Sequence, residues 1–273
     1  MPLVKIPRER REYLADLGQG VWQEFSRHVP VFLDSIVEDN ELSMSYGDYG
    51  EAFEGLIEHR SGRFHIYINT ARSPVGSPRT RFTLGHELGH FFIDEHRNAL
   101  ASGRPPHPSF PNRPSDNPAE QEANLFSSYL LMPAQQYKAN IITAKSGLQA
   151  IRDIASTFQV SVQCSALRYV VGSERPCAVI MFRNGAKPWW DVSPELESKG
   201  LVWLRDLERE FPQDFATARA KASDPKKPIE IYANPTVAEV WFSNVAATGT
   251  RNVVLREESV RLGQRGVLTL LTM

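Results

Sequence analysis

Two histidines four residues apart, His86 and His90, flank the glutamate Glu87. On an α-helix, residues four apart lie on one face a turn apart, so both imidazoles can bind a single metal ion. Glu87 lies next to that face, from which its carboxylate can take a proton from a water molecule and later pass it to a leaving amine. This HExxH pattern is typical of zinc-dependent hydrolases and predicts a metallopeptidase with Glu87 as its catalytic base.

The segment around this pattern is too apolar for a surface helix. HExxH is short enough to occur by chance, often on solvated helices that are rich in charge. Here Thr80 is a candidate N-cap, and large apolar residues surround the motif, namely Phe82, Leu84, Leu88, Phe91, Phe92 and Ile93. Two histidines and a glutamate would be costly to bury there without partners, which a metal ion and its water supply. The context therefore favours a genuine metal-binding helix.

A second helix is predicted within residues 118–133, because Pro118 opens this segment and Pro133 closes it. It contains two candidates for a third metal ligand. The face of Glu122 is apolar and carries Leu125, Phe126 and Tyr129. The face of Glu120 is small and polar and carries Ala123, Asn124, Ser127 and Ser128. Because the apolar face should pack inward, Glu122 is the predicted ligand and Glu120 the alternative, with Asn124 or Glu120 as candidates for orienting a ligand.

His96 offers a rival third ligand, since it lies ten residues after His86, as in the metzincin pattern HExxHxxGxxH. That pattern has a glycine where this chain has Ile93, because the backbone must turn sharply after the second histidine. If the helix continues through Ile93, His96 points away from His86 and His90. The sequence therefore disfavours the metzincin ligand set.

Residues 81–90 followed by residues 122–133 resemble the ImmA/IrrE family of bacterial metallopeptidases. The resemblance spans about residues 30–172, and the two motifs in this order are far more specific than HExxH alone. Two features differ from the family pattern. Ser127 and Ser128 stand where alanine is more usual, and the proline-rich stretch at residues 97–117 is longer than expected.

This resemblance implies a small gluzincin-like zinc peptidase fold, with His86, His90 and Glu122 on the metal and Glu87 as general base. Zinc is the expected ion and manganese the alternative. The resemblance also implies the substrate, a transcriptional repressor with a helix-turn-helix domain. Its cleavage would switch on genes for stress response or for mobile-element transfer.

The chain is predicted to be an α+β protein in three parts, since 273 residues exceed one typical domain. Residues 1–133 form the zinc metallopeptidase-like domain with N-terminal packing helices, and residues 134–172 form a helical, helix-turn-helix-like subdomain. Residues 173–273 form a C-terminal mixed α/β domain, for which a GAF-like sensor is one candidate. Strands are expected there near residues 177–182, 229–232, 238–242, 253–255 and 267–271, around a helix near 201–220.

Three expectations concern the surroundings of the metal helix. Residues 8–39 are predicted to be helical, and residues 41–69 to form a small antiparallel sheet that ends in a hairpin. The last strand, residues 63–69, is expected to be an edge strand that pairs with an extended substrate. The proline-rich residues 97–117 are expected to be irregular, either gripping a substrate or serving as solvated filler.

The composition indicates which binding partners and which cellular location to expect. The 31 Lys and Arg residues nearly balance 32 Asp and Glu, so no global positive field points to nucleic acid. The predicted helix-turn-helix segment offers only Arg168 as a DNA contact, so direct nucleic-acid binding is not expected. The charged N-terminus and the absence of a long apolar run argue against a signal peptide or a membrane span. A cytoplasmic protein with free buried thiols at Cys164 and Cys177 is expected.

Two classes of function fit these residues. The first is a zinc endopeptidase that acts on a protein substrate. The second is a non-proteolytic, metal-binding regulator that sequesters a repressor partner. Glu87 favours the endopeptidase, because a structural metal site needs no general base and would have a closed fourth ligand position.

Overall fold

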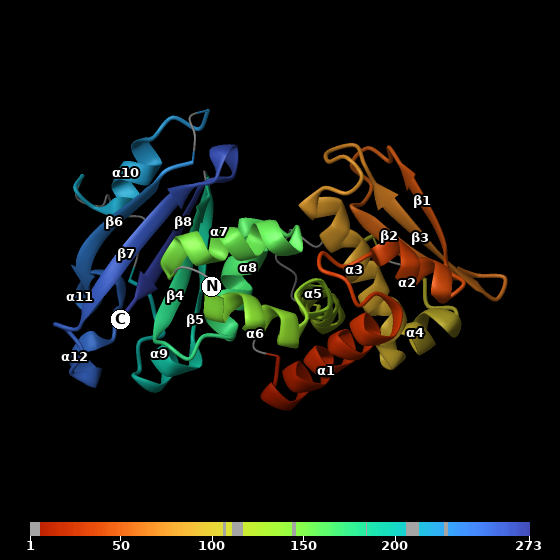
Figure 1. Ribbon diagram of the computed structural model, residues 1–273, viewed down its shortest axis with the longest axis horizontal. Coiled ribbons are helices and arrows are strands. Elements are labelled where there is room, and N and C mark those ends of the chain that lie inside the picture. The colour runs from red at the N-terminus through yellow and green to blue at the C-terminus, as the bar shows by residue number, and fades with distance from the viewer. Residues whose placement is uncertain are drawn as a thin grey trace. The chain divides into compact units, whose positions relative to one another are not determined.

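The chain is a mixed α+β protein in the computed structural model, which describes residues 6–105, 108–110, 117–143, 146–183, 185–205, 213–226 and 229–273. Its helices and two sheets confirm the predicted α+β class. The chain divides into two compact units (Figure 1). The N-terminal unit comprises residues 4–143 and 154–161, and the C-terminal unit comprises mainly residues 144–153 and 162–273. The proposed three-part division at residues 133 and 172 stays a prediction.

The N-terminal unit contains a three-stranded sheet of strands β1 (Ser43–Gly47), β2 (Gly55–Arg60) and β3 (Arg63–Asn69) in the order β1-β3-β2. The β2–β3 hairpin is antiparallel as predicted, and Ser61 and Gly62 turn it with positive φ angles. However, β1 pairs with β3 in parallel. The expectation that residues 63–69 form an edge strand is wrong, because β3 is central and β1 and β2 are the edge strands.

Helix α3 (Pro78–Phe92) carries the HExxH residues and packs against β2 and β3. It begins one turn earlier than predicted, because Ser77 is the N-cap and its hydroxyl accepts from the Thr80 amide at 3.3 Å. It ends at Phe92, because Ile93 adopts an extended backbone with φ −77° and ψ 110°. Helix α4 (Asp94–Ala101) then follows, so the expected loop over residues 97–117 is helical in its first part.

Further helices stack on α3 on the side away from the sheet. Helix α5 (Pro118–Leu131) begins and ends close to its predicted bounds, with the side chain of Asn117 as N-cap. It packs against α3 on one side and against α1 (Arg8–Phe25) on the other, while α2 (Leu33–Asp39) contacts β1 and α3. The unit is therefore layered as sheet, α3, α5 and α1, an order visible in Figure 1. This layering places the middle of α3 between a sheet edge and a second helix.

The predicted helical region after residue 133 consists of three helices in the described part of the chain. They are α6 (Ala134–Thr143), α7 (Gly147–Phe158) and α8 (Val162–Val171), and α7 contributes to both units. Arg168, the only basic residue of α8, is 9% exposed. It is therefore a packing residue of the C-terminal unit rather than an exposed contact for DNA.

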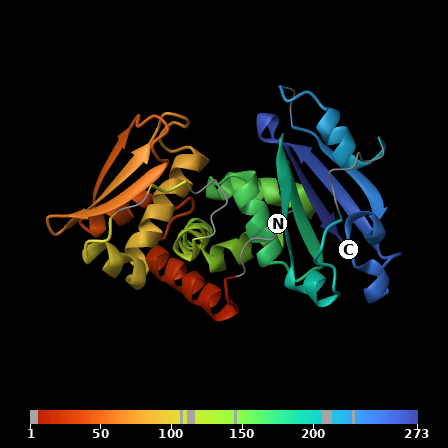
Figure 2. The same cartoon turned by 180° about the vertical axis from the view of Figure 1, so that it is seen from behind.

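The C-terminal unit contains a five-stranded antiparallel sheet in the order β5-β4-β8-β7-β6, seen from behind in Figure 2. Its strands are β4 (Cys177–Arg183), β5 (Ala186–Val192), β6 (Ile231–Val237), β7 (Val254–Arg261) and β8 (Val267–Thr272). Neighbouring residues of β7 mark its two faces. Glu257 accepts a hydrogen bond from the Thr217 amide of α10 (Ala216–Ala222), whereas Glu258 accepts one from the Leu148 amide of α7.

Two sequence expectations for this unit differ from the structure. Residues 238–242 were expected to be a strand, but they form the short helix α11 (Ala238–Trp241), in which Trp241 is fully buried. The large apolar side chains of residues 238–242 pack in a core that includes Phe182, which explains the apolar pattern of this segment. The predicted helix near residues 201–220 is limited, where described, to the residues of α10 at its end. Helices α9 (Pro194–Ser198) and α12 (Val245–Thr248) and the 3-10 helix η1 (Gly263–Arg265) complete the unit.

No helix in the described part of the chain is both long and apolar enough to cross a bilayer.

Candidate metal centre

Three side chains from α3 and α5 converge on one point: His86, His90 and Glu120. The Nε2 atom of His86 lies 3.3 Å from Glu120 Oε2, and that of His90 lies 3.1 Å from Glu120 Oε1. The two imidazole Nε2 atoms lie 3.2 Å apart. One ligand atom from each residue falls within 4.8 Å of the others, and all three residues are buried. This is the arrangement that two histidines and a carboxylate need to bind one divalent ion.

The structure does not bring the predicted third ligand, Glu122, to this point. Glu122 points to the other side of α5, where it forms a two-pronged ion pair with Arg10 of α1 at 3.0 and 2.6 Å. Its Oε2 atom also lies 3.3 Å from His96 Nε2. Glu122 therefore links α5 to α1 and α4, and it is Glu120, the alternative considered from sequence, that converges with His86 and His90.

The helical-wheel preference failed because small residues on α5 mark a close helix contact, not an exposed face. A Cβ atom at Gly85 of α3 would lie 2.6 Å from Ser127 Oγ, and one at Gly89 would lie 3.1 Å from the Ala123 α carbon. Ser127 is fully buried and donates a hydrogen bond to the Phe82 carbonyl at 2.9 Å. The small residues that made the Glu120 face look exposed are what let α5 approach α3 closely enough for Glu120 to reach the histidines.

Asn124 orients the first histidine. Its Oδ1 atom lies 3.0 Å from His86 Nδ1, one turn along α5 from Glu120. The Asn124 oxygen accepts from Nδ1–H of His86, so Nε2 is the ring nitrogen that faces Glu120 and His90. The sequence suggested Asn124 for such a role, and the geometry agrees with that suggestion.

His96 lies beside the centre but outside the converging set. The break at Ile93 turns the chain without a glycine, so the assumption of a continuing helix was wrong and the His96 ring centroid lies 5.1 Å from that of His90. An extended backbone is an easy conformation for a β-branched residue. The His96 Nε2 atom nevertheless contacts Glu122, and the group of converging ligand atoms is completed by Glu120 instead.

Burial and mutual contacts set the charges of the cluster. Burial lowers the pKa of His90 to about 4, which keeps this imidazole neutral. Burial acts to raise the pKa of Glu120, but hydrogen bonds with His86 and His90 outweigh it and lower that pKa. In His86, burial acts to lower the pKa, but the hydrogen bond with Glu120 and the charge of Glu87 raise it. A metal ion at this point would compete with protons for the ligand atoms of the cluster.

Glu87 occupies a closed compartment under the start of β2. It is fully buried, and among the described residues neither of its carboxylate oxygens has a hydrogen-bond partner of standard geometry. Burial raises its pKa to about 7, while the Ser109 hydroxyl and the Ile57 backbone act in the opposite direction. Gly55 lies directly against the carboxylate, because a Cβ atom there would overlap Glu87 Oε1. Sequence reasoning missed both Gly55 and Ser109, since neither residue lies in a recognisable motif.

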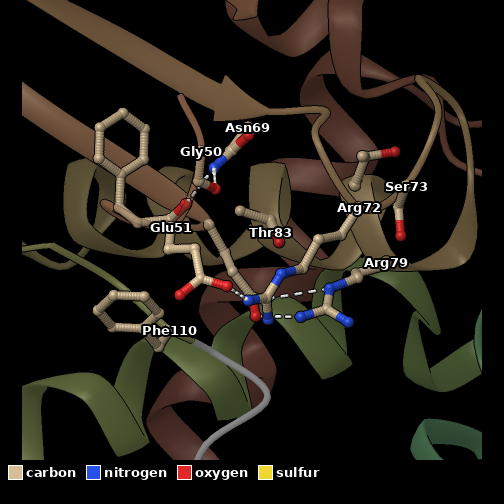
Figure 3. Close-up of a pocket in the computed structure, with 11 residues that line it drawn as sticks. Gly50, Glu51, Asn69, Arg72, Ser73, Arg79, Thr83 and Phe110 are labelled. Atoms are coloured by element: carbon tan, nitrogen blue, oxygen red, sulfur yellow. Dashed lines mark hydrogen bonds and ion pairs between the residues drawn. The ribbon is translucent and has the colours of Figure 1, made fainter. Parts of the chain in front are cut away.

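A shallow pocket adjoins this compartment (Figure 3). Thr83, one turn before Glu87 on α3, lies in its wall, together with Gly50 and with Phe110 on the opposite side. Arg72 pairs with Glu51 and Arg79 pairs with Glu54 across it. Its free volume of about 20 Å³ holds little more than one water molecule. Any larger group would enter only if one of these side chains moved.

The donor set fits the expected metal. Two imidazoles and one carboxylate converge, the Nδ1 atom of His86 is held from behind, and a carboxylate with unused hydrogen-bonding capacity lies beside the first ligand. Three protein ligands that leave a fourth position open are typical of catalytic zinc sites, whereas structural sites close all four positions. The arrangement can therefore hold a divalent ion and place Glu87 as a base next to it.

Comparison with known proteins agrees with this geometry. A family model for the IrrE N-terminal-like domain of the M78 peptidases matches residues 44–169, which contain His86, Glu87, His90 and Glu120. A solved structure of a Mycobacterium tuberculosis transcriptional regulator has a similar fold, with a TM-score of 0.61 over 97% of this chain and 90% of that chain, at 11% sequence identity. No curated protein sequence matches the chain. Residues 44–169 are therefore similar to the IrrE N-terminal-like domain, and the resemblance to the ImmA/IrrE family of metallopeptidases is confirmed.

Proposed function

We propose that the protein is a zinc-dependent endopeptidase that hydrolyses one peptide bond in a protein substrate. The observation that carries this proposal is the convergence of His86, His90 and Glu120 beside the buried carboxylate of Glu87. We assign the first three residues as metal ligands and Glu87 as the general base. Zinc is the proposed ion, with manganese as the alternative.

Bound at this centre, the ion would polarise a water molecule and the scissile carbonyl. Glu87 accepts the proton of the attacking water and later delivers it to the leaving amine. Burial, which raises the pKa of Glu87 in the metal-free protein, makes its carboxylate a stronger base. Asn124 keeps the imidazole of His86 in one orientation throughout.

The substrate we propose is a transcriptional repressor with a helix-turn-helix domain, cut in an extended or locally unfolded segment. The support for this partner is the family resemblance. An extended segment is required because β2, the strand next to α3, can pair only with an extended backbone. Cleavage would release genes for stress response or for mobile-element transfer. We place the reaction in the cytoplasm, where the thiols of Cys164 and Cys177 would stay free as they are in the structure.

The C-terminal unit is the proposed sensor of the activating signal. Its open five-stranded antiparallel sheet is compatible with a GAF-like domain. Trp241 is fully buried in its core and Trp190 packs against that core, whereas Trp203 is 56% exposed. Trp190 and Trp241 are therefore accounted for by packing.

The test is incubation of the purified, zinc-loaded protein with the repressor encoded beside its gene, followed by mass spectrometry of the products. One dominant cut is expected. The Glu87→Gln variant should keep about one metal ion per chain and lose at least about a hundredfold in rate, as expected for a general base. Full activity of that variant would rule out Glu87 as the base.

The same experiment separates the alternative function, a metal-binding regulator that sequesters the repressor without cutting it. In that case the repressor would stay intact, yet both the wild-type protein and the Glu87→Gln variant would strip it from its operator DNA. Chelation of the metal would distinguish the two further. It should stop cleavage completely, but a sequestering protein would lose its partner only if the metal also held the fold.

A further inference from the structure

The general base is closed off in the structure, although the proposed reaction requires it to meet both water and substrate. Both carboxylate oxygens of Glu87 are shielded from solvent. Two neighbours cover them, Gly55 at the start of β2 and Ser109 from the stretch between α4 and α5. Ser109 is only 1% exposed. One of these two covers must move before a substrate can reach Glu87.

Ser109 lies along the free edge of β2 as an added strand would. Its carbonyl accepts hydrogen bonds from the amides of Glu54 at 2.9 Å and Gly55 at 3.4 Å, and its amide donates to the Gly55 carbonyl at 3.0 Å. The pairing of Gly55 with Ser109 is an antiparallel bridge. An extended peptide that joins an exposed sheet edge uses the same backbone groups. Residues 108–110, the strap, therefore occupy the place at Gly55 where a substrate backbone would pair.

Of the two covers, the strap is the weaker. Strand β2 pairs with β3 along its full length from Gly55 to Arg60 and packs on α3. Among the described residues, the backbone hydrogen bonds between the strap and the sheet are those of Ser109. Such bonds contribute about 0.5–1.5 kcal/mol each, so a competing peptide that forms the same bonds can displace the strap at little net cost.

The side chain of Phe110 extends the same obstruction. It lies in the wall of the pocket on the side opposite Thr83 (Figure 3). The pocket is therefore too small for a substrate side chain while the strap is in place. Displacement of Pro108–Phe110 would free the edge of β2 and one wall of the pocket in a single movement.

We propose that Pro108, Ser109 and Phe110 form an autoinhibitory strap, which competes with an extended peptide substrate for the edge of β2 beside Glu87. This inference rests on the proposed peptidase function and adds to it a means of regulation. Substrate binding then requires release of the strap. A protein contact or signal that loosens the strap would raise activity without changing the metal centre.

The test compares two zinc-binding probes on the zinc-loaded protein by titration calorimetry. One is a peptide hydroxamate, which binds metal and carries an extended backbone that can pair with β2. The other is acetohydroxamic acid, which binds metal but has no backbone to pair. The variant is Ser109→Pro, because proline removes the amide that donates to the Gly55 carbonyl. The matched control is Ser109→Ala, which keeps every backbone bond of the strap.

We expect Ser109→Pro to bind the peptide hydroxamate about 2- to 10-fold more tightly, the equivalent of one lost hydrogen bond, and to bind acetohydroxamic acid unchanged. Ser109→Ala should match the wild type for both probes. Phe110→Ala, a second way of loosening the strap, should also favour the peptide hydroxamate. Zinc content and circular dichroism equal to the wild type verify that each variant is folded.

The two proposals fail in different ways. If acetohydroxamic acid binds all proteins alike and neither Ser109→Pro nor Phe110→Ala gains affinity for the peptide hydroxamate, the strap does not compete and this inference is wrong. If Ser109→Ala changes affinity as much as Ser109→Pro does, the hydroxyl of Ser109 acts on Glu87 and the strap is again refuted. If neither probe binds the wild type, the proposed metal centre fails and the strap proposal falls with it.

Discussion

Gly89 of α3 lies against the backbone of α5 so closely that a methyl group there would come within 3.1 Å of the Ala123 α carbon and 3.2 Å of its carbonyl oxygen. Backbone atoms cannot rotate away, so the separation of the two helices is set by this contact. His90 follows Gly89 in sequence, and Glu120 precedes Ala123 by one helical turn. The distance between the two metal-binding helices therefore depends on a glycine at position 89.

The first prediction is that Gly89→Ala weakens metal binding. Alanine improves helix propensity by about 1 kcal/mol, but overpacking of a tight core contact costs about 1–3 kcal/mol, so the net effect on stability is small or destabilising. The larger effect falls on the ligands, because α5 must shift and carry Glu120 away from His90. Calorimetric zinc titration should show the loss. Gly20→Ala in α1, where nothing lies within 4 Å, is the matched control and should stabilise the protein.

The second prediction concerns Gly85, where a second substitution should restore the stability that the first one removes. Gly85→Ala would bring a methyl group to 2.6 Å from Ser127 Oγ, but the next nearest atom is Ser127 Cβ at 3.4 Å. The single variant should therefore lose stability, and the Gly85→Ala/Ser127→Ala double variant should recover most of it. A urea denaturation double-mutant cycle measures the coupling between the two positions, expected at about 0.5–3 kcal/mol for residues in contact. Additive effects would contradict the tight contact between α3 and α5.

The sequence predicted the parts of the site that one helix determines. His86, Glu87 and His90 are fixed relative to one another by helical spacing, so their proximity follows from local geometry alone. The bounds of α5 were also predictable, because Asn117 and Pro118 are strong helix-start signals. A helix-start signal of this kind is local and does not depend on the neighbours of the helix.

Features that depend on contacts between elements were not predictable in the same way. The choice between Glu120 and Glu122 required the knowledge that α5 lies between two helices, so that both of its faces are covered. The pairing of Glu122 with Arg10 spans 112 positions in sequence. The place of β3 in the middle of its sheet likewise depended on the parallel pairing of β1, which no local pattern indicates.

The third prediction separates the two glutamates of α5. Glu120→Gln should lose most of the bound metal, because it removes the charged ligand between His86 and His90. Glu122→Gln should keep the metal but lower the free energy of unfolding by about 1.5–3 kcal/mol, since it weakens a partly buried pair with Arg10. Metal content by atomic emission and thermal unfolding measure the two effects. The reverse pattern would restore Glu122 as the ligand.

The fourth prediction concerns the group behind His86. Asn124→Ala removes the acceptor for His86 Nδ1 and should lower metal affinity by about 10- to 100-fold, the range found for groups that orient a metal ligand. Asn124→Asp keeps an acceptor at the same atom and should retain most of the affinity. Competition with a chromophoric chelator gives both constants. An unchanged affinity in the alanine variant would mean that packing alone orients the imidazole.

The last prediction concerns the pH dependence of stability in the C-terminal unit. Glu257 is fully buried under α10, where one carboxylate oxygen accepts from the Thr217 amide at 2.6 Å and the other is buried without a hydrogen bond. Burial raises the pKa of Glu257 above its ordinary value of 4.5, and the hydrogen bonds from Thr217 and Ala216 oppose that rise only in part. Between the ordinary and the raised pKa, the folded protein holds a proton that the unfolded chain has released. The free energy of unfolding should therefore fall as pH rises through this window, because the folded state binds more protons there.

Glu257→Gln cannot ionise and should lack this slope. Urea denaturation of both proteins across a pH series gives the difference in unfolding free energy. That difference should be constant below the ordinary pKa and should then move in favour of the variant until the raised pKa has been passed. A difference that stays constant across the series would mean that Glu257 titrates alike in the folded and unfolded chains.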